Sequence, residues 1–110
     1  MSLTTLATGL RFPEGPVVLP DGSIAIVEIE AQVISRIAPD GTRNIISRTG
    51  GGPNGIAAGP DNTLILCNNG GFSWHEEPEI LRPSGVAADY THGRIEVVDI
   101  ASGAVRMLYD

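Results

Sequence analysis

Residues 13–30 read PEGPVVLPDGSIAIVEIE, and residues 53–70 read PNGIAAGPDNTLILCNNG. The two stretches align without a gap at an offset of 40 residues. Identical residues recur at four places, which are Pro13/Pro53, Gly15/Gly55, Pro20/Pro60 and Asp21/Asp61. An internal repeat of this length indicates that the chain is built from two copies of one structural unit.

The repeated unit is predicted to consist of short β-strands. With 14 Gly and 8 Pro in 110 residues, the chain leaves no room for a helix of useful length. Between these breaks lie eight β-branched or alternating runs, at residues 16–19, 24–28, 33–37, 42–47, 55–58, 64–67, 94–100 and 104–109. The segments Pro20-Asp21-Gly22 and Pro39-Asp40-Gly41 between runs are typical of hairpin turns.

A later hairpin also recurs, but at an offset of 62, with Gly41 over Gly103 and Ile45-Ile46 over Met107-Leu108. The second unit therefore carries about 22 extra residues, which we place in an inserted loop at about 70–92. A repeat of about 40 residues with four strands is typical of one β-propeller blade. An eight-stranded β-sandwich has the right strand number but does not explain the repeat.

The predicted fold class is therefore all-β, a fragment of a β-propeller with two four-stranded antiparallel blades. Residues 1–110 form one partial propeller domain, with blade 1 at about 11–49 and blade 2 at about 53–110. Two blades leave broad apolar faces exposed, because each blade of a propeller packs against its neighbours.

Composition excludes several classes of partner. A net charge of -6 disfavours nucleic acid and anionic lipid surfaces. No apolar run approaches the length of about 20 residues that crosses a bilayer, so no membrane association is expected. The single cysteine, Cys67, follows the apolar run Leu64-Ile65-Leu66 and is expected to be a buried, reduced thiol, which fits a cytoplasmic location.

Glu14 and Asn54 occupy equivalent places at the starts of the two units. The innermost strand of a propeller blade comes first, so both side chains are expected at one mouth of the central channel. A carboxylate and an amide oxygen are hard ligands that suit calcium, magnesium or manganese. The alternative is that both side chains only satisfy backbone amides where their strands begin.

The stretch Arg11-Phe12-Pro13-Glu14-Gly15-Pro16-Val17-Val18 resembles the opening motif of the senescence marker protein/gluconolactonase (regucalcin-like) family. The segments at residues 52–57 (GPNGIA) and 66–71 (LCNNGG), and Gly93-Arg94-Ile95-Glu96 with Asp99 and Gly103, are similar to blade 2 of bacterial members. The resemblance covers nearly the whole chain as the N-terminal portion of that family.

The resemblance implies a six-bladed propeller that hydrolyses a sugar-type lactone with one divalent cation in its channel. Calcium is the first candidate, and zinc, magnesium and manganese are the others. Glu14 matches the metal-binding Glu of the first blade, while Asn54 and Asn68 match substrate-binding or outer-shell positions. The other direct ligands and the catalytic carboxylate belong to later blades, so no catalytic residue is assigned and little lactonase activity is expected of 110 residues alone.

The insertion contains Phe72, Trp74, His75, Glu76, Glu77 and Glu79. One interpretation is a metal cluster, a second is an aromatic lid over the channel mouth built on Trp74, and the third is a solvated acidic loop with one anchoring Trp. His92 is expected to be a turn residue rather than a base.

Whether the chain is an enzyme stays open at this point. The alternatives to a partial lactonase are a non-catalytic binding propeller and an inactive truncated fragment. A further alternative is a homo-oligomer through the exposed blade faces, in which three copies close one six-bladed ring.

Overall fold

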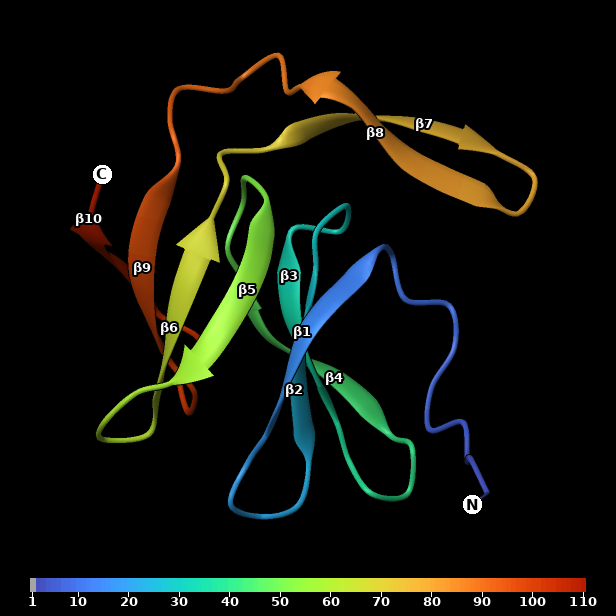
Figure 1. Ribbon diagram of the computed structural model, residues 1–110. Helices are drawn as coiled ribbons and strands as arrows, with labels where there is room; N and C mark the ends of the chain where they lie inside the picture. The colour runs from blue at the N-terminus through green and yellow to red at the C-terminus, as the bar shows by residue number, and fades with distance from the viewer. Residues whose placement is uncertain (1) are drawn as a thin grey trace.

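The computed structural model describes residues 2–110 and contains two four-stranded antiparallel sheets and a separate two-stranded hairpin (Figure 1). The first sheet, blade 1, has the order β1-β2-β3-β4, with β1 Pro13–Val18, β2 Ile24–Glu28, β3 Val33–Ile37 and β4 Arg43–Arg48. The second, blade 2, has the order β5-β6-β9-β10, with β5 Pro53–Ala58, β6 Thr63–Asn68, β9 Arg94–Asp99 and β10 Val105–Tyr109. The prediction of an all-β chain with two four-stranded antiparallel blades is confirmed.

The predicted turns form as their chemistry dictates. In the β1–β2 turn the Asp21 carboxylate accepts a hydrogen bond from the Ser23 N–H at 3.0 Å. In the β3–β4 turn Asp40 accepts one from the Thr42 N–H at 2.9 Å. Gly22 and Gly41 follow these Asp residues with φ of +85° and +88°, a conformation that favours glycine.

The hydrophobic core lies between the two blades. Blade 1 contributes Leu19, Ala25, Val27 and Ile34, and blade 2 contributes Leu64, Leu66 and Val98. Because side chains alternate along a strand, one face of each blade supplies this core. We call the core-lining face of blade 1 its rear face and the core-lining face of blade 2 its front face.

The hairpin β7–β8 is where the structure differs most from the sequence-based expectation. Residues 70–92 were expected to form a loop, but β7 (Phe72–Glu77) and β8 (Ile80–Val86) pair across the two-residue turn Pro78-Glu79. Glu79 takes φ of +66°, which a two-residue turn requires in many cases. Three glutamates and two prolines in this segment hide the strand signal, although Phe72 and Trp74 already alternate with polar residues.

Cys67 corrects a second expectation, because its thiol is exposed rather than buried. Leu64, Leu66 and Asn68 of β6 face blade 1 and are fully buried or nearly so. Ile65 and Cys67 alternate with them and therefore lie on the opposite face of the sheet, which no other part of residues 2–110 covers completely.

Truncating a core side chain should destabilise the chain strongly. Leu66→Ala removes a completely buried side chain from the contact between the blades, and we expect the free energy of unfolding to fall by about 2–5 kcal/mol. Urea denaturation followed by circular dichroism measures the change. Ile80→Ala, at a 48% exposed hairpin position, is the control and should change the value by less than about 0.5 kcal/mol. Equal effects of the two substitutions would show that the blades do not share a core.

Candidate functional site

The inner strands β1 and β5 of the two blades lie side by side (Figure 1). Gly15 and Gly55 come close to each other, since a Cβ atom built on Gly15 would lie 3.6 Å from the Gly55 Cα. Gly15 also takes φ of +50°, and the register of β1 against β2 shifts at this point. Glu14 and Asn54 directly precede these two glycines, so the repeat brings their backbones together at one place.

Both predicted ligand residues are solvent-exposed in the structure. A carboxylate and an amide oxygen are suitable ligands for a hard cation, but calcium takes six to eight oxygens. Within residues 2–110 no group of three or more His, Cys, Asp or Glu side chains is arranged to hold a metal ion. Glu14 and Asn54 together therefore supply at most two of the oxygens that such a cation requires.

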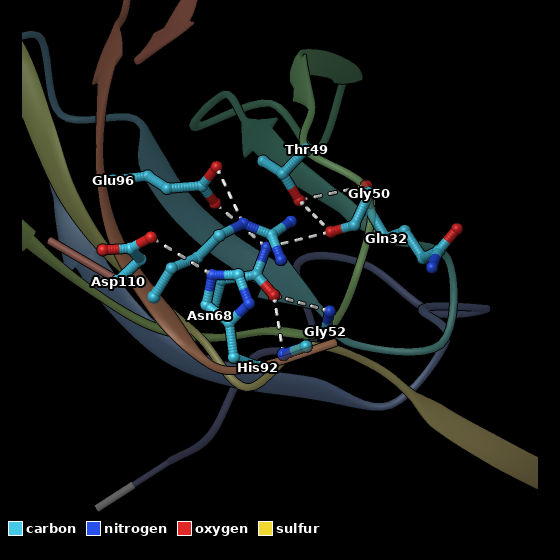
Figure 2. Close-up of polar contacts among 10 residues, drawn as sticks. Gln32, Thr49, Gly50, Gly52, Asn68, His92, Glu96 and Asp110 are labelled. Carbon is cyan, nitrogen blue, oxygen red and sulfur yellow. Dashed lines mark hydrogen bonds and ion pairs between the residues drawn. The ribbon is translucent and has the colours of Figure 1, made fainter. Parts of the chain in front are cut away.

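Asn68 lies at the end of β6 and is only 3% exposed, and Figure 2 shows its polar contacts with the segment that precedes β5. Its Oδ1 accepts hydrogen bonds from the N–H groups of Gly52 and Gly70 at 2.9 and 3.0 Å. Its Nδ2 donates to the Gly50 carbonyl and to Glu96 Oε1, both at 3.0 Å. Two of these four hydrogen bonds fix the Gly50–Gly52 linker, which leads into β5 and Asn54, and the other two hold Gly70 and Glu96.

Glu28 is the blade 1 counterpart of Asn68 at the offset of 40, and sequence reasoning missed it. It is 4% exposed and accepts a hydrogen bond from the Arg11 N–H at 2.8 Å, while the Ser35 hydroxyl donates to its other oxygen. Both residues hold the segment that precedes the inner strand of their own blade. The repeat alignment places Glu28 and Asn68 at equivalent positions, and this equivalence is the sequence signal that could have identified Glu28.

The β7–β8 hairpin arches over the ends where β1 and β5 begin (Figure 1). The Trp74 ring lies 5.1 Å from the Phe12 ring, centroid to centroid, and 5.8 Å from the Phe72 ring in an edge-to-face arrangement. Phe12 stands two residues before Glu14 in the chain. Trp74 is therefore placed near the start of β1, where a lid would have to lie.

Arg11 attaches the hairpin to blade 1. Its guanidinium donates to both carboxylate oxygens of Glu76 in the hairpin, at 2.8 and 2.9 Å. It also donates to both oxygens of Glu30, which follows β2, at 2.9 and 3.0 Å. The hydrogen bonds with Glu76 and Glu30 raise the pKa of Arg11, and the hydrogen bond from Arg11 lowers the pKa of Glu76.

Both histidines of the insertion form exposed pairs with carboxylates. His75 Nε2 lies 2.8 Å from Glu77 Oε1, and His92 Nε2 lies 3.7 Å from Asp110 Oδ2. Within residues 2–110, neither histidine forms a hydrogen bond or an ion pair with Glu14. The interpretation of a solvated acidic loop therefore describes His75 and Glu77, whereas Glu76 is committed to Arg11.

Removing the Arg11 side chain should release the hairpin. Trp74 is the only tryptophan, so its emission reports on the Phe12 contact directly. We expect Arg11→Ala to shift that emission several nanometres to the red, with a smaller change in overall stability. Arg36→Ala, which removes an ion pair with Asp21 at the far end of blade 1, should leave the emission unchanged.

The same release is expected at acid pH. The pKa of Glu76 is lower in the folded chain than in the unfolded chain, so its pairing contributes above the unfolded value and is lost as the pH falls through the folded value. The red shift should therefore appear below about pH 4 in the parent chain. An emission maximum that does not move in either experiment would mean that Arg11 does not hold the hairpin.

The substitution Asn68→Asp tests whether Asn68 stabilises the fold in the absence of a ligand. Aspartate keeps an acceptor but loses both donated hydrogen bonds and adds a charge beside Glu96. We expect the free energy of unfolding to fall by about 2–4 kcal/mol, measured without any ligand. The control is the neighbouring Asn69→Asp, which keeps the acceptor for the Gly71 N–H. This variant should change the free energy of unfolding by less than about 0.5 kcal/mol. A stable Asn68→Asp variant would argue against the structural task.

Comparison with known proteins supports the fold. No protein-family model matches this chain, and no curated protein sequence does either. Among solved structures, the chain is similar to the PQQ-bound form of an aldose sugar dehydrogenase from Streptomyces coelicolor, with a TM-score of 0.66 and 21% sequence identity. The match covers 97% of this chain and 32% of that one, so this chain spans about a third of its length.

The same comparison adds little on chemistry. At this identity the likeness establishes an architecture of β-propeller type and nothing finer. In residues 2–110 no helix is long and apolar enough to cross a bilayer. The chain is thus a two-blade propeller segment whose candidate site is the channel mouth around Glu14 and Asn54.

Proposed function

We propose that this chain is part of a metal-dependent lactonase that hydrolyses a sugar-type lactone. The observation that supports the proposal is that Glu14 and Asn54 stand at equivalent positions near the starts of two strands, β1 and β5, that lie against each other, and that both side chains are exposed. The resemblance of residues 11–18 to the opening motif of the gluconolactonase family supports it. The solved structure to which the chain is similar is itself a sugar enzyme.

Glu14 is the proposed metal ligand, and Asn54 is proposed to contact the substrate or the outer shell of the metal. A divalent cation, with calcium as the first candidate, would polarise the ester carbonyl and lower the pKa of a bound water. The chain's own part is to hold these two oxygens in place, through the close approach of Gly15 and Gly55 and the fixed linker at Gly50–Gly52.

Asn68 is proposed to act as a positioning residue for Asn54 rather than as a direct substrate contact. All four hydrogen-bonding capacities of its amide are occupied within the protein, so a substrate would have to displace one of them. Trp74 is proposed to supply an apolar wall for the ring of the lactone, since aromatic faces pack well on sugar rings and the hairpin lies over this mouth.

A binding propeller without turnover is the second candidate. It is favoured by the small number of ligands that residues 2–110 contribute, because one carboxylate and one amide hold a hard ion weakly. Binding without hydrolysis is then the expected behaviour, and cation binding alone does not require a catalytic carboxylate.

The test is Glu14→Gln, which removes the charge of the proposed ligand at an exposed position where folding should not suffer. We expect Mn²⁺ affinity, measured by water proton relaxation, to fall at least tenfold. Hydrolysis of glucono-δ-lactone above the uncatalysed rate, followed in a pH-stat, should fall with it wherever it is detectable. Glu79→Gln, at the exposed tip of the hairpin, is the matched control and should alter neither.

Two results would contradict the proposal. Mn²⁺ affinity that is the same in the parent chain and in Glu14→Gln would remove Glu14 from the metal site. Lactone hydrolysis that persists in Glu14→Gln would place the reaction elsewhere in the molecule.

A further inference from the structure

One side-chain oxygen joins the two segments that lead into the candidate site. The Oδ1 atom of Asn68 accepts a hydrogen bond from the Gly52 N–H at 2.9 Å and another from the Gly70 N–H at 3.0 Å. Gly52 directly precedes β5, which carries Asn54, and Gly70 stands two residues before β7, which carries Trp74. Asn68 therefore ties the start of the inner strand of blade 2 to the start of the hairpin.

The two segments also touch each other at this place. The Asn69 N–H donates to the Gly52 carbonyl at 2.8 Å. A Cβ atom built on Gly71 would lie 3.5 Å from the carbonyl carbon of Gly51. A Cβ atom on Gly51 itself would collide with the Asn68 amide, so the linker lies directly on that side chain. A change in the orientation of this amide is therefore expected to reach both segments.

The orientation of an amide is determined by which of its partners donate and which accept. The Nδ2 atom of Asn68 only donates, and it lies 3.0 Å from an oxygen of Glu96 and 3.0 Å from the Gly50 carbonyl (Figure 2). Gly50 belongs to the linker and moves with it. Glu96 belongs to β9, which is paired on both sides in its sheet. Of the two acceptors, Glu96 is thus the fixed reference for the amide.

Glu96 is itself held in place by a charged partner. Its Oε2 lies 3.1 Å from the Nε of Arg94, and the two side chains are 8% and 18% exposed. Both residues come from β9. Separating such a buried pair leaves two charges without partners, which is strongly unfavourable. The carboxylate therefore has one stable position, with one oxygen toward Arg94 and the other toward Asn68.

Blade 1 makes the same contact with the chemistry exchanged. At the offset of 40, Glu28 corresponds to Asn68. The strand pairing makes Ser35 the counterpart of Glu96. In blade 1 the carboxylate stands on the second strand, and it accepts from the Ser35 hydroxyl and from the Arg11 N–H. In both blades, an acceptor that is hydrogen-bonded to the third strand holds the segment before the inner strand.

We propose that Glu96 is a positioning residue, which orients the Asn68 amide and so couples the position of Asn54 to the position of the hairpin. The coupling of the two backbone segments stands on the contacts above. Only its effect on a bound cation rests on the proposed function. Because coupling between two sites is reciprocal, a cation held at Asn54 would also stabilise the hairpin in its place.

The first test is Glu96→Gln in the 110-residue chain, which keeps the shape of the side chain and removes its charge. The new amide has one donor end, so it cannot accept from both Asn68 and Arg94 as the carboxylate does. Hydrogen exchange measured by NMR, without any ligand, reports on the two N–H groups directly. We expect the amides of Gly52 and Gly70 to exchange roughly tenfold faster, relative to the other amides, as the loss of a hydrogen bond implies.

The matched control is Val98→Ala, which truncates a completely buried side chain near the opposite end of the same strand. This variant also lowers the overall stability, but it should not single out Gly52 and Gly70 among the amides. Trp74 emission is the second measurement. It should shift several nanometres to the red in Glu96→Gln and stay unchanged in Val98→Ala.

The exchanged pair, Asn68→Asp with Glu96→Gln, tests the orientation itself. It puts the carboxylate on β6 and a donor on β9, which is the arrangement of blade 1. The new carboxylate accepts from Gly52 and Gly70, and the new amide donates to it and accepts from Arg94. We expect slow exchange to return in part, so that the two substitutions together have a smaller effect than the sum of both. Comparison with Asn68→Asp alone gives the answer even where Glu96→Gln alone does not fold.

Three outcomes would overturn the proposal. The first is unchanged exchange of Gly52 and Gly70 in Glu96→Gln, and the second is faster exchange of only one of them. The third is a double variant in which both amides exchange faster than in either single variant.

Mn²⁺ affinity is measured separately, because it alone depends on the proposed function. It should fall in Glu96→Gln and not in Val98→Ala. A parent chain that binds no Mn²⁺ would reject the proposed metal site, and the exchange rates would still decide whether Glu96 couples the two segments. Failure of the two proposals can therefore be distinguished.

Discussion

The packing of Leu64 and Leu66 against the rear face of blade 1 is the contact on which the rest of the structure depends. Each four-stranded sheet is too thin to bury side chains by itself, so its apolar residues leave water only between two blades. Ala25, Val27 and Ile34 supply the other side of that layer and are completely buried. The angle and spacing of the blades follow from this layer, and the position of the inner strands follows from the blades.

The same packing determines where chemistry is available. Side chains on the two faces of a blade pack against neighbouring blades. Side chains at the beginnings of the inner strands do not take part in this packing. Glu14 and Asn54 lie at such beginnings and are exposed, while Glu28 and Asn68, at the ends of the adjoining strands, are buried and hydrogen-bonded to backbone. Close together in the fold, two polar side chains therefore stabilise the backbone and two are exposed to solvent.

Much of this was readable from the sequence, because the repeat and the turns are local signals. The offset of 40 aligned Glu14 with Asn54 in the repeat. Asp21 and Asp40 indicated two hairpin turns, and both turns are present in the structure. The β7–β8 hairpin was not readable in the same way, since its strands are rich in Glu and Pro and owe their position to contacts with Phe12 and Arg11, about 60 residues away in sequence. The exposure of Cys67 was missed because an apolar run does not say which of its alternating side chains has a partner.

Two features that look unrelated, an apolar face and an incomplete ligand shell, have one physical origin. A propeller channel is lined by one inner strand from each blade, so two blades contribute two channel-mouth side chains and no more. The same two blades bury one front face and one rear face, and they leave one of each unpaired. Any blade that covers Ile65 and Cys67 must therefore also bring its own inner strand to the channel. A blade that completes the core would for that reason also complete the proposed site.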